Sequence, residues 1–174
     1  MRPLATVIPG FVTAAIVAVA VLCVLFAVDD VETAGAAEVM TPLQRVEATP
    51  KGELKNPYTD YEAVAEEGHK KYFSASCNGC HGGGGGGGIC PPLTNTVWVY
   101  GRDDDTLFRL IALGSDELQK QGYTRVQHEV VTGPMPPFGT ILKTDDDLWK
   151  IIAWIRSVNP DSLKPRVKLK PPSD

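Results

Sequence analysis

The chain has 174 residues, of which 43% are hydrophobic, and this suits one modest globular domain plus a targeting segment. Its net charge at pH 7 is −4, and half of that charge lies in the first 36 residues. The remaining domain is therefore nearly neutral, which argues against binding to nucleic acid or to anionic lipid.

A long apolar run occupies residues 11–28, with Arg2 before it and acidic residues after it. As a helix it spans roughly 27 Å, close to the hydrocarbon thickness of a bilayer of about 30 Å, so it is long for a signal peptide and just long enough for a membrane anchor. Small residues at 34–36 offer a cleavage site, and we favour a cleaved signal peptide over residues 1–36. Either way, the rest of the chain is expected in the periplasm, soluble or tethered by residues 11–28.

Residues 37–57 are polar, contain three prolines and show no apolar period, which predicts an extended arm. The folded domain is expected over residues 58–158. It begins with residues 60–73, whose apolar spacing, acidic first turn and basic last turn predict a helix. Gly68 is unfavourable inside that helix, so we expect an aromatic side chain, Trp154, to pack against it.

The chemistry of the chain centres on Cys77-Asn78-Gly79-Cys80-His81. Two thiols separated by two residues and followed by histidine indicate attachment of c-type haem: each cysteine adds across a porphyrin vinyl group, and the imidazole lies beneath the iron. We therefore predict one covalent haem c on Cys77 and Cys80, with His81 as an iron ligand.

Three other interpretations of this motif are a zinc half-site, a thioredoxin-like dithiol and a chance coincidence. Zinc would need a second ligand pair, whereas the other cysteines, Cys23 and Cys90, are single. A dithiol catalyst is expected between a strand and a helix, whereas glycines follow here. With haem attached and Cys23 cleaved away, Cys90 is an odd thiol in an oxidising compartment.

Seven glycines, residues 82–88, follow the motif and precede a Pro91-Pro92-Leu93 turn. A tether between domains has no place there, so the run is interpreted as an adaptable loop over one haem edge. The turn from Pro91 to Leu93 resembles the place where a backbone carbonyl accepts the Nδ1 proton of the ligating histidine.

Next come three side chains that carry donors suited to haem propionates: Trp98, Arg102 and, less strongly, Tyr100. Each also has an ordinary interpretation, Trp98 as a core residue and the other two as surface residues. The acidic residues 103–105 and the apolar spacing after them predict a short helix that ends at Gly114.

Residues 122–143 lack a helical period, and an irregular span of this length is usually functional. Within it Met135 is surrounded by three prolines, which suits rigid presentation of its sulfur to the iron. We predict Met135 as the second axial ligand. Its competitors are Met40, His69 and His128.

Residues 144–158 predict the last helix, with Thr144 as its cap, three acidic residues in its first turn and a buried apolar stripe. The tail from 159 to 174 is rich in lysine and proline and is expected at the surface or disordered.

Over residues 57–158 these motifs together resemble a class I c-type cytochrome, through the attachment motif, the proline-leucine turn, the methionine loop and the final Ala153-Trp154-Ile155-Arg156. The resemblance implies an all-α fold with short helices around one haem ligated by His81 and Met135. More narrowly, the glycine run leading into Cys90-Pro91-Pro92-Leu93, with Gly133-Pro134-Met135-Pro136-Pro137-Phe138 downstream, is similar to methanol-induced periplasmic cytochromes of methylotrophic bacteria. These accept electrons from quinoprotein alcohol dehydrogenases, including the lanthanide-dependent methanol dehydrogenase.

We therefore expect a single-electron carrier rather than an enzyme, passing electrons from a pyrroloquinoline quinone methanol or alcohol dehydrogenase to a downstream cytochrome or terminal oxidase. Two alternatives stay open. A retained anchor is compatible with a membrane-bound subunit of a larger respiratory or alcohol-oxidising complex, and an unbound Met135 would leave an open iron site, as in a peroxidase.

Overall fold

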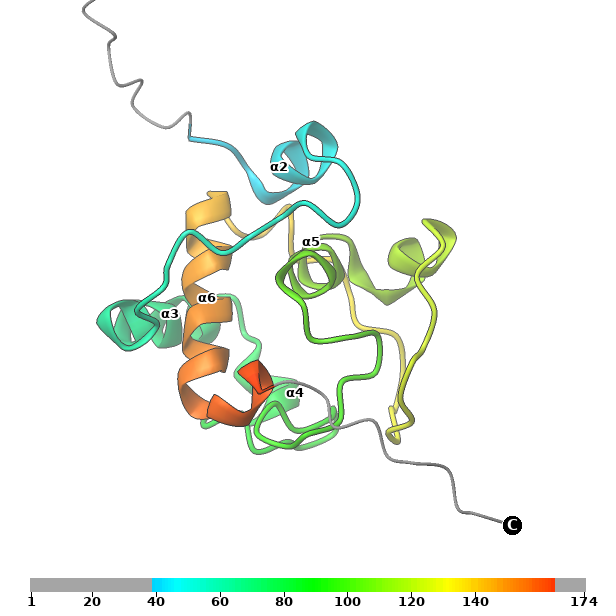
Figure 1. The fold of residues 1–174 in the computed structure, drawn as a ribbon. Helices are drawn as coiled ribbons and strands as arrows, with labels where there is room; N and C mark the ends of the chain where they lie inside the picture. The colour runs from blue at the N-terminus through cyan, green and yellow to red at the C-terminus, as the bar shows by residue number, and fades with distance from the viewer. Residues whose placement is uncertain (1–38, 165–174) are drawn as a thin grey trace, which may run out of the picture. The chain divides into compact units, whose positions relative to one another are not determined.

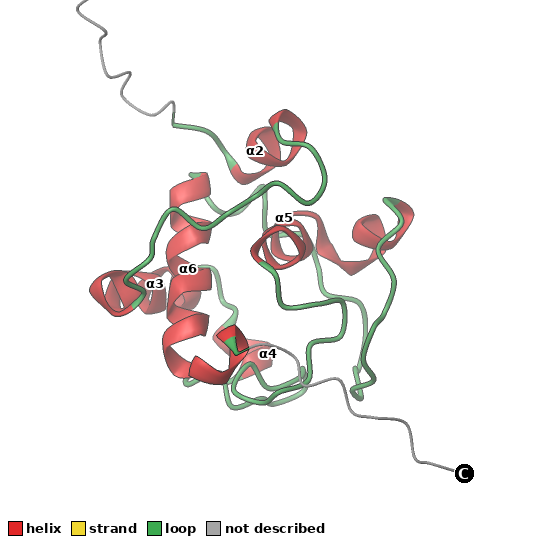
Figure 2. Ribbon diagram, viewed as in Figure 1, coloured by secondary structure: helices red, strands yellow, loops and turns green. Residues whose placement is uncertain are grey.

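A computed structural model describes residues 39–164. The described chain is entirely helical and irregular, with no strand (Figures 1 and 2). Its elements are α2 (Pro42–Ala48), α3 (Glu62–Ser74), α4 (Asn78–His81), α5 (Asp104–Lys120), α6 (Asp145–Val158) and the 3₁₀ helix η1 (Pro160–Leu163). The predicted all-α class is confirmed. The expected signal peptide or anchor and the end of the tail, residues 165–174, lie outside the described residues.

Helix α6 forms at the predicted place and carries much of the core. Its N-cap Thr144 accepts a hydrogen bond from the Asp147 amide at 3.1 Å, and acidic residues fill its first turn. Its apolar stripe is buried, with Leu148 and Ile152 fully inaccessible. None of the helices between residues 39 and 164 is both long and apolar enough to cross a bilayer.

Helices α3 and α6 cross in close contact at Gly68 (Figure 1). A Cβ atom on Gly68 would lie 2.0 Å from the backbone oxygen of Lys150 and 2.9 Å from Cβ of Trp154. The predicted contact with Trp154 is confirmed, but the tightest constraint is the Lys150 carbonyl, because helix backbones this close leave no room for a side chain.

The predicted end of a helix at Gly114 is confirmed, because Gly114 has φ +76° and breaks the helical geometry of α5. A second helical segment, which the sequence did not indicate, follows the break and carries α5 to Lys120. The reason is a contact with a distant part of the chain. At this break the Ser115 amide donates to the carbonyl of Met135 at 2.9 Å, and a Cβ on Gly114 would lie 2.7 Å from that same oxygen.

The extended arm predicted for residues 37–57 is wrong in its middle, where α2 forms. Thr41 and Gln44 make a capping box, and Pro42 occupies the first turn, where proline is favoured. Val46 and Leu54 join the hydrophobic core. The arm is therefore an integral part of the folded domain.

Residues 122–143 contain no regular helix or strand, as expected. The tail begins differently from the prediction, because η1 continues directly after α6 and buries Ser162 together with Asn159. The Asn159 side chain donates to the carbonyls of Leu93 at 2.8 Å and Asn95 at 2.7 Å. This contact ties the end of α6 to the segment that follows the glycine loop.

Candidate functional site

A cavity within the described residues has a volume of about 360 Å³ and a predominantly apolar lining. The parts of the chain that line it include α4 with the turn at 90–93, residues 97–101, the inner face of α5 and the loop around Met135. Tyr72 of α3 and Ile151 and Ile155 of α6 also line it. Its size is that of a site for a small molecule or cofactor, typically about 300–1,000 Å³. The predicted haem residues can therefore be located relative to this one cavity.

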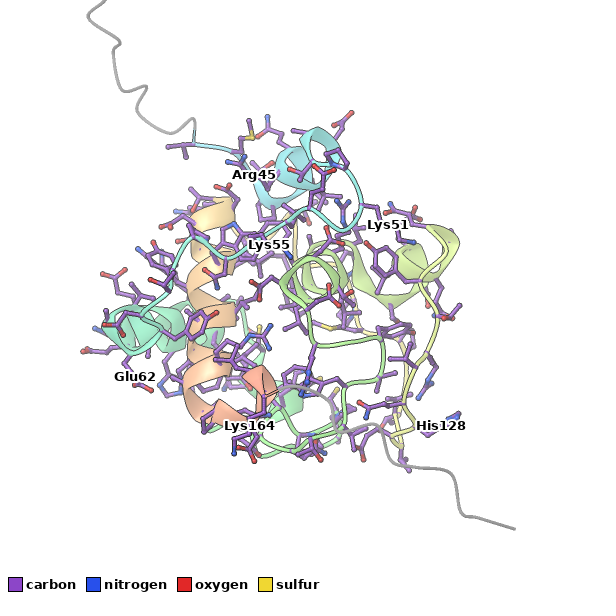
Figure 3. All side chains as sticks on the ribbon, in the orientation of Figure 1. Arg45, Lys51, Lys55, Glu62, His128 and Lys164 are labelled. Carbon is purple, nitrogen blue, oxygen red and sulfur yellow. The ribbon has the colours of Figure 1, made fainter. Side chains whose placement is uncertain are left out.

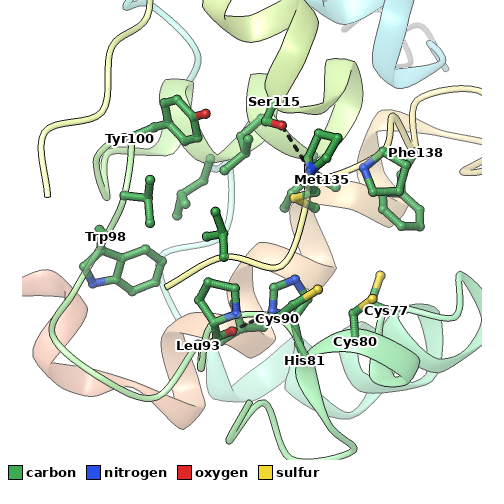
Figure 4. A pocket seen from close by; sticks show the side chains of 18 of the residues that line it. Cys77, Cys80, His81, Cys90, Leu93, Trp98, Tyr100, Ser115, Met135 and Phe138 are labelled. Atoms are coloured by element: carbon green, nitrogen blue, oxygen red, sulfur yellow. Dashed lines mark hydrogen bonds between the residues drawn. The ribbon is translucent and has the colours of Figure 1, made fainter. Parts of the chain in front are cut away.

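The attachment motif lies on one short turn of helix at the wall of this cavity. Cys77 is the residue before α4, and its amide donates to the carbonyl of Tyr72 at 3.1 Å, so that α4 is joined directly to α3. Ser76 between them takes a positive φ of 63°. Both Cys77 and Cys80 line the cavity (Figure 4). Burial raises the pKa of the Cys77 thiol to about 11, which keeps the thiol protonated before it reacts.

His81 is held by the turn that the sequence indicated. Its Nδ1 donates to the carbonyl of Pro91 at 2.7 Å. Because a carbonyl only accepts, Nδ1 carries the proton and the lone pair on Nε2 is free to bind a metal. Burial lowers the pKa of His81, which favours the neutral, metal-binding form over the imidazolium.

Met135 lies across the cavity from His81, on the wall formed by α5 (Figure 4). Its backbone is fixed at both ends, since its amide donates to Oγ of Ser115 at 3.0 Å and its carbonyl accepts from the Ser115 amide at 2.9 Å. Sequence reasoning missed Ser115, which only the fold brings to Met135. The proposed competitors lie elsewhere: His128 is exposed at the edge of the molecule (Figure 3), and Met40 and His69 do not line the cavity.

The glycine run is an ordered loop held by hydrogen bonds to the residues around it. Tyr72 Oη donates to the Gly82 carbonyl at 2.6 Å, His69 Nε2 donates to the Gly83 carbonyl at 2.8 Å, and the Leu93 amide donates to the Gly85 carbonyl at 2.7 Å. The Gly87 amide donates to the His81 carbonyl at 2.9 Å. At Gly82 a side chain is excluded, because φ is +78° and a Cβ would lie 2.7 Å from the Gly87 oxygen. The loop thus packs beside α4.

Among the predicted haem-environment residues, Pro91, Leu93, Trp98 and Tyr100 line the cavity. Arg102 does not, because its guanidinium turns away and donates to the backbone carbonyl of Lys164. The backbone carbonyl of Arg102 instead accepts from Arg156 of α6 at 2.5 Å. The prediction for the Arg102 side chain is therefore not supported by its placement.

Arg156 belongs to the final-helix motif, but sequence reasoning gave its side chain no role. Its side chain is buried, its Cζ lies 5.9 Å from the centre of the Trp98 ring, and it pairs with Asp104 at 2.8 Å. Within the described residues, its Nε and Nη1 and the Nε1 of Trp98 are buried without a hydrogen-bond partner. Buried donors without a partner are costly, and Trp98, which lines the cavity, would gain an acceptor from a carboxylate such as a haem propionate. With two thiols, a neutral imidazole and a thioether around an apolar space, the residues present fit haem.

Comparison with known proteins gives one match. The family model described as Cytochrome c matches residues 65–159, which is more than half of the chain and spans α4, α5 and α6. No curated protein and no solved structure matches this chain. The motif, the cavity and the family match agree, and the chain belongs to the cytochrome c family, class I, whose domain carries covalently bound haem c.

Proposed function

We propose that this protein carries single electrons on one haem c that is bonded to Cys77 and Cys80 and ligated by His81 and Met135. The observation that carries the proposal is the placement of His81 and Met135 on opposite walls of one apolar cavity, each held by its own hydrogen bonds. Bound haem c supplies a one-electron couple. The protein residues attach it, orient it and keep water from it.

The presence of two protein ligands for the iron supports an electron carrier rather than an enzyme. His81 and Met135 would hold the iron through an imidazole and a thioether, and an iron held by both would have no position open for a substrate. The Pro91 carbonyl increases the electron donation of the imidazole, and the neutral thioether favours the ferrous state. The apolar lining lowers the local dielectric, which further favours the less charged redox state.

The ligand assignment is tested by comparing wild type with Met135→Ala and with Met40→Ala as the matched control. The ferric wild type is expected to show the weak red absorption band of methionine–iron ligation and to bind no added cyanide at low concentration. Met135→Ala should lose the band, bind cyanide readily and have a lower reduction potential, while Met40→Ala should match wild type. Ready binding of cyanide and absence of the band in the wild type would instead indicate an open-site haem enzyme.

The electron donor that we propose is a periplasmic quinoprotein methanol or alcohol dehydrogenase, with a downstream cytochrome or terminal oxidase as acceptor. Support comes from the resemblance carried by the glycine run, the Cys90-Pro91-Pro92-Leu93 turn and the methionine loop. The ordered packing of the glycine run beside the attachment turn adds to that support, because it brings backbone without side chains close to the cavity.

A docking surface for such a partner is proposed at the rim of the cavity. Ile89 is 64% exposed and Val130 is 89% exposed, and the Thr132 hydroxyl donates to the Ile89 carbonyl at 2.5 Å, which joins their two segments. Val131 also lines the cavity. Phe138, in the methionine loop, is half-buried and packs on the core. A small apolar surface of this kind suits a brief encounter between redox partners.

The partner is tested by mixing substrate-reduced quinoprotein methanol dehydrogenase with the oxidised cytochrome and following haem reduction. The wild type should be reduced rapidly, and both Ile89→Asp and Val130→Asp should slow the reaction. Val39→Asp is the control, since Val39 is equally apolar and 77% exposed but precedes α2. Absence of reduction in the wild type would remove the donor assignment, while equal rates in all variants would remove only the docking surface.

A further inference from the structure

A buried asparagine, Asn159, connects the end of the last helix to the turn that holds His81. Asn159 lies between α6 and η1, and it is only 2% exposed. Its Nδ2 donates to the carbonyl of Leu93 at 2.8 Å and to the carbonyl of Asn95 at 2.7 Å. A side-chain amide nitrogen has two protons, so both are used on this one segment. The two bonds therefore fix the segment relative to α6.

The backbone of Asn159 is itself fixed. Its amide donates to the carbonyl of Arg156 at 3.2 Å, and its carbonyl accepts from the amide of Ser162 at 2.9 Å. The helix before it, α6, carries fully buried residues such as Ile152. The side-chain amide is therefore presented from a rigid part of the core rather than from a loop.

The turn that receives these bonds cannot hold its position through its own amides. Pro91 and Pro92 have no backbone N–H, so neither can donate a hydrogen bond to a neighbour. The turn is therefore held at the residues on either side of it. Before the turn, the Cys90 amide donates to a carbonyl of α4 at 3.2 Å, and after it the Leu93 amide donates to the Gly85 carbonyl at 2.7 Å.

Leu93 is the anchor that follows the turn, and it is held at both of its backbone polar groups. Its amide bonds to the glycine loop, and its carbonyl accepts from Asn159. A Cβ on Gly85 would lie 3.4 Å from Cβ of Leu93 and 3.5 Å from Cη2 of Trp154, so the loop, Leu93 and α6 are in contact. Of the two hydrogen bonds, the one from Asn159 links Leu93 to the core.

The consequence for His81 follows from the short chain between Leu93 and Pro91. Leu93 is two residues after Pro91, whose carbonyl accepts from Nδ1 of His81 at 2.7 Å. A shift of that carbonyl by about 1 Å would break the bond, because hydrogen bonds are lost beyond roughly 3.5 Å. We propose that Asn159 is a positioning residue for His81: by holding Leu93, it keeps the Pro91 carbonyl on Nδ1 and so fixes the orientation and the tautomer of the ring. The proposal rests on the proposed function, in which His81 binds the iron.

The test is hydrogen exchange, followed by NMR on the ferrous, haem-loaded protein. It compares the Nδ1 proton of His81 and the Leu93 amide with the Phe108 amide of α5, a fully inaccessible core residue that reports overall unfolding. Asn159→Leu keeps the branched shape of the side chain and removes its donors. Asn159→Ala removes the same donors without placing new apolar atoms beside the two carbonyls.

In both variants the His81 and Leu93 protons should exchange about tenfold faster or more, relative to the Phe108 amide, than in wild type, because the turn opens locally without its hydrogen bonds to Asn159. Ser162→Ala is the matched control. Ser162 is also buried, in η1, and its hydroxyl has no hydrogen-bond partner among the described residues. All three protons should therefore exchange in this variant as they do in wild type.

Two results would overturn the proposal. An equal increase for all three protons would show that Asn159 contributes only to overall stability, and unchanged exchange of the His81 proton would show that the turn keeps its place without Asn159. Failure of the proposed function is a different outcome. The His81 ring protons of the wild type would then lack the ring-current shift of a haem ligand, whatever the exchange rates, and both proposals would be wrong.

Discussion

Ser115 and Met135 exchange two hydrogen bonds: the Met135 amide donates to the Ser115 hydroxyl at 3.0 Å, and the Ser115 amide donates to the Met135 carbonyl at 2.9 Å. The pair joins the break in α5 at Gly114 to the loop that carries the proposed iron ligand. The position of that ligand therefore depends on a residue 20 positions earlier in the chain, in an element that is otherwise part of the core.

Ser115→Ala is predicted to weaken methionine ligation without abolishing it. The change removes the hydroxyl acceptor and leaves the Met135 amide without a partner in a half-buried place, at a cost of about 1 kcal/mol or somewhat more. The red band of methionine–iron ligation should therefore disappear at a lower temperature than in wild type. Ser74→Ala, which removes an exposed hydroxyl in α3, is the control and should leave the band unchanged.

Gly68→Ala is predicted to be strongly destabilising. Its Cβ would lie 2.0 Å from the Lys150 backbone oxygen, so α3 and α6 would have to move apart, at a cost of roughly 1–3 kcal/mol or more. Gly84→Ala is the control, because Gly84 has no atom within 4 Å of a built Cβ and no positive φ. Denaturant unfolding of the two variants measures the difference. Equal midpoints for both would show that the helix contact is looser than the structure indicates.

Asp105 is the centre of a buried network that fixes the segment after α2. Its carboxylate pairs with Arg109 at 3.0 Å and accepts from Tyr123 Oη at 2.6 Å. Arg109 in turn donates to the carbonyls of Thr49 at 2.6 Å and Pro50 at 3.0 Å. Burial by itself would raise the pKa of Asp105, but hydrogen bonds from Tyr123 and Arg109 outweigh it and lower the pKa below 3.8.

The pH dependence follows from that lowered pKa. A carboxyl whose folded pKa is below its unfolded value stabilises the fold above the unfolded pKa, and this contribution is lost as pH falls through the folded pKa. Wild type should therefore lose stability as the pH drops below about 4. Asp105→Asn should be less stable at pH 7 by about 3–5 kcal/mol, because Arg109 stays buried without its partner. The variant should also lose less stability than wild type as the pH falls, because it lacks this carboxyl. Asp161→Asn, at an exposed ion pair, is the control.

Local patterns were sufficient for α3, α6 and the attachment turn, because capping residues, apolar spacing and the cysteine motif lie within a few residues of each other. They were insufficient for α2, which has only seven residues and is stabilised by Arg109, 60 positions away. The continuation of α5 beyond Gly114 likewise depends on Met135. The contact of Arg156 with Trp98 also joins residues that are far apart in the sequence, so no role was predicted for the Arg156 side chain. Only the fold shows which arginine approaches Trp98.

The last prediction separates Trp98 from Arg102 at the haem. Trp98 lines the cavity with a buried Nε1 that has no acceptor among the described residues, whereas the Arg102 guanidinium donates to the Lys164 carbonyl. Trp98→Phe keeps the aromatic packing but removes the donor. A propionate that loses a donor carries a less compensated negative charge, which favours ferric iron, so the reduction potential should fall and the spectrum should keep its methionine band. Arg102→Gln should leave the potential close to that of wild type. Redox titration of both variants measures the difference. A larger fall of the reduction potential in Arg102→Gln than in Trp98→Phe would indicate that Arg102, and not Trp98, binds the propionate.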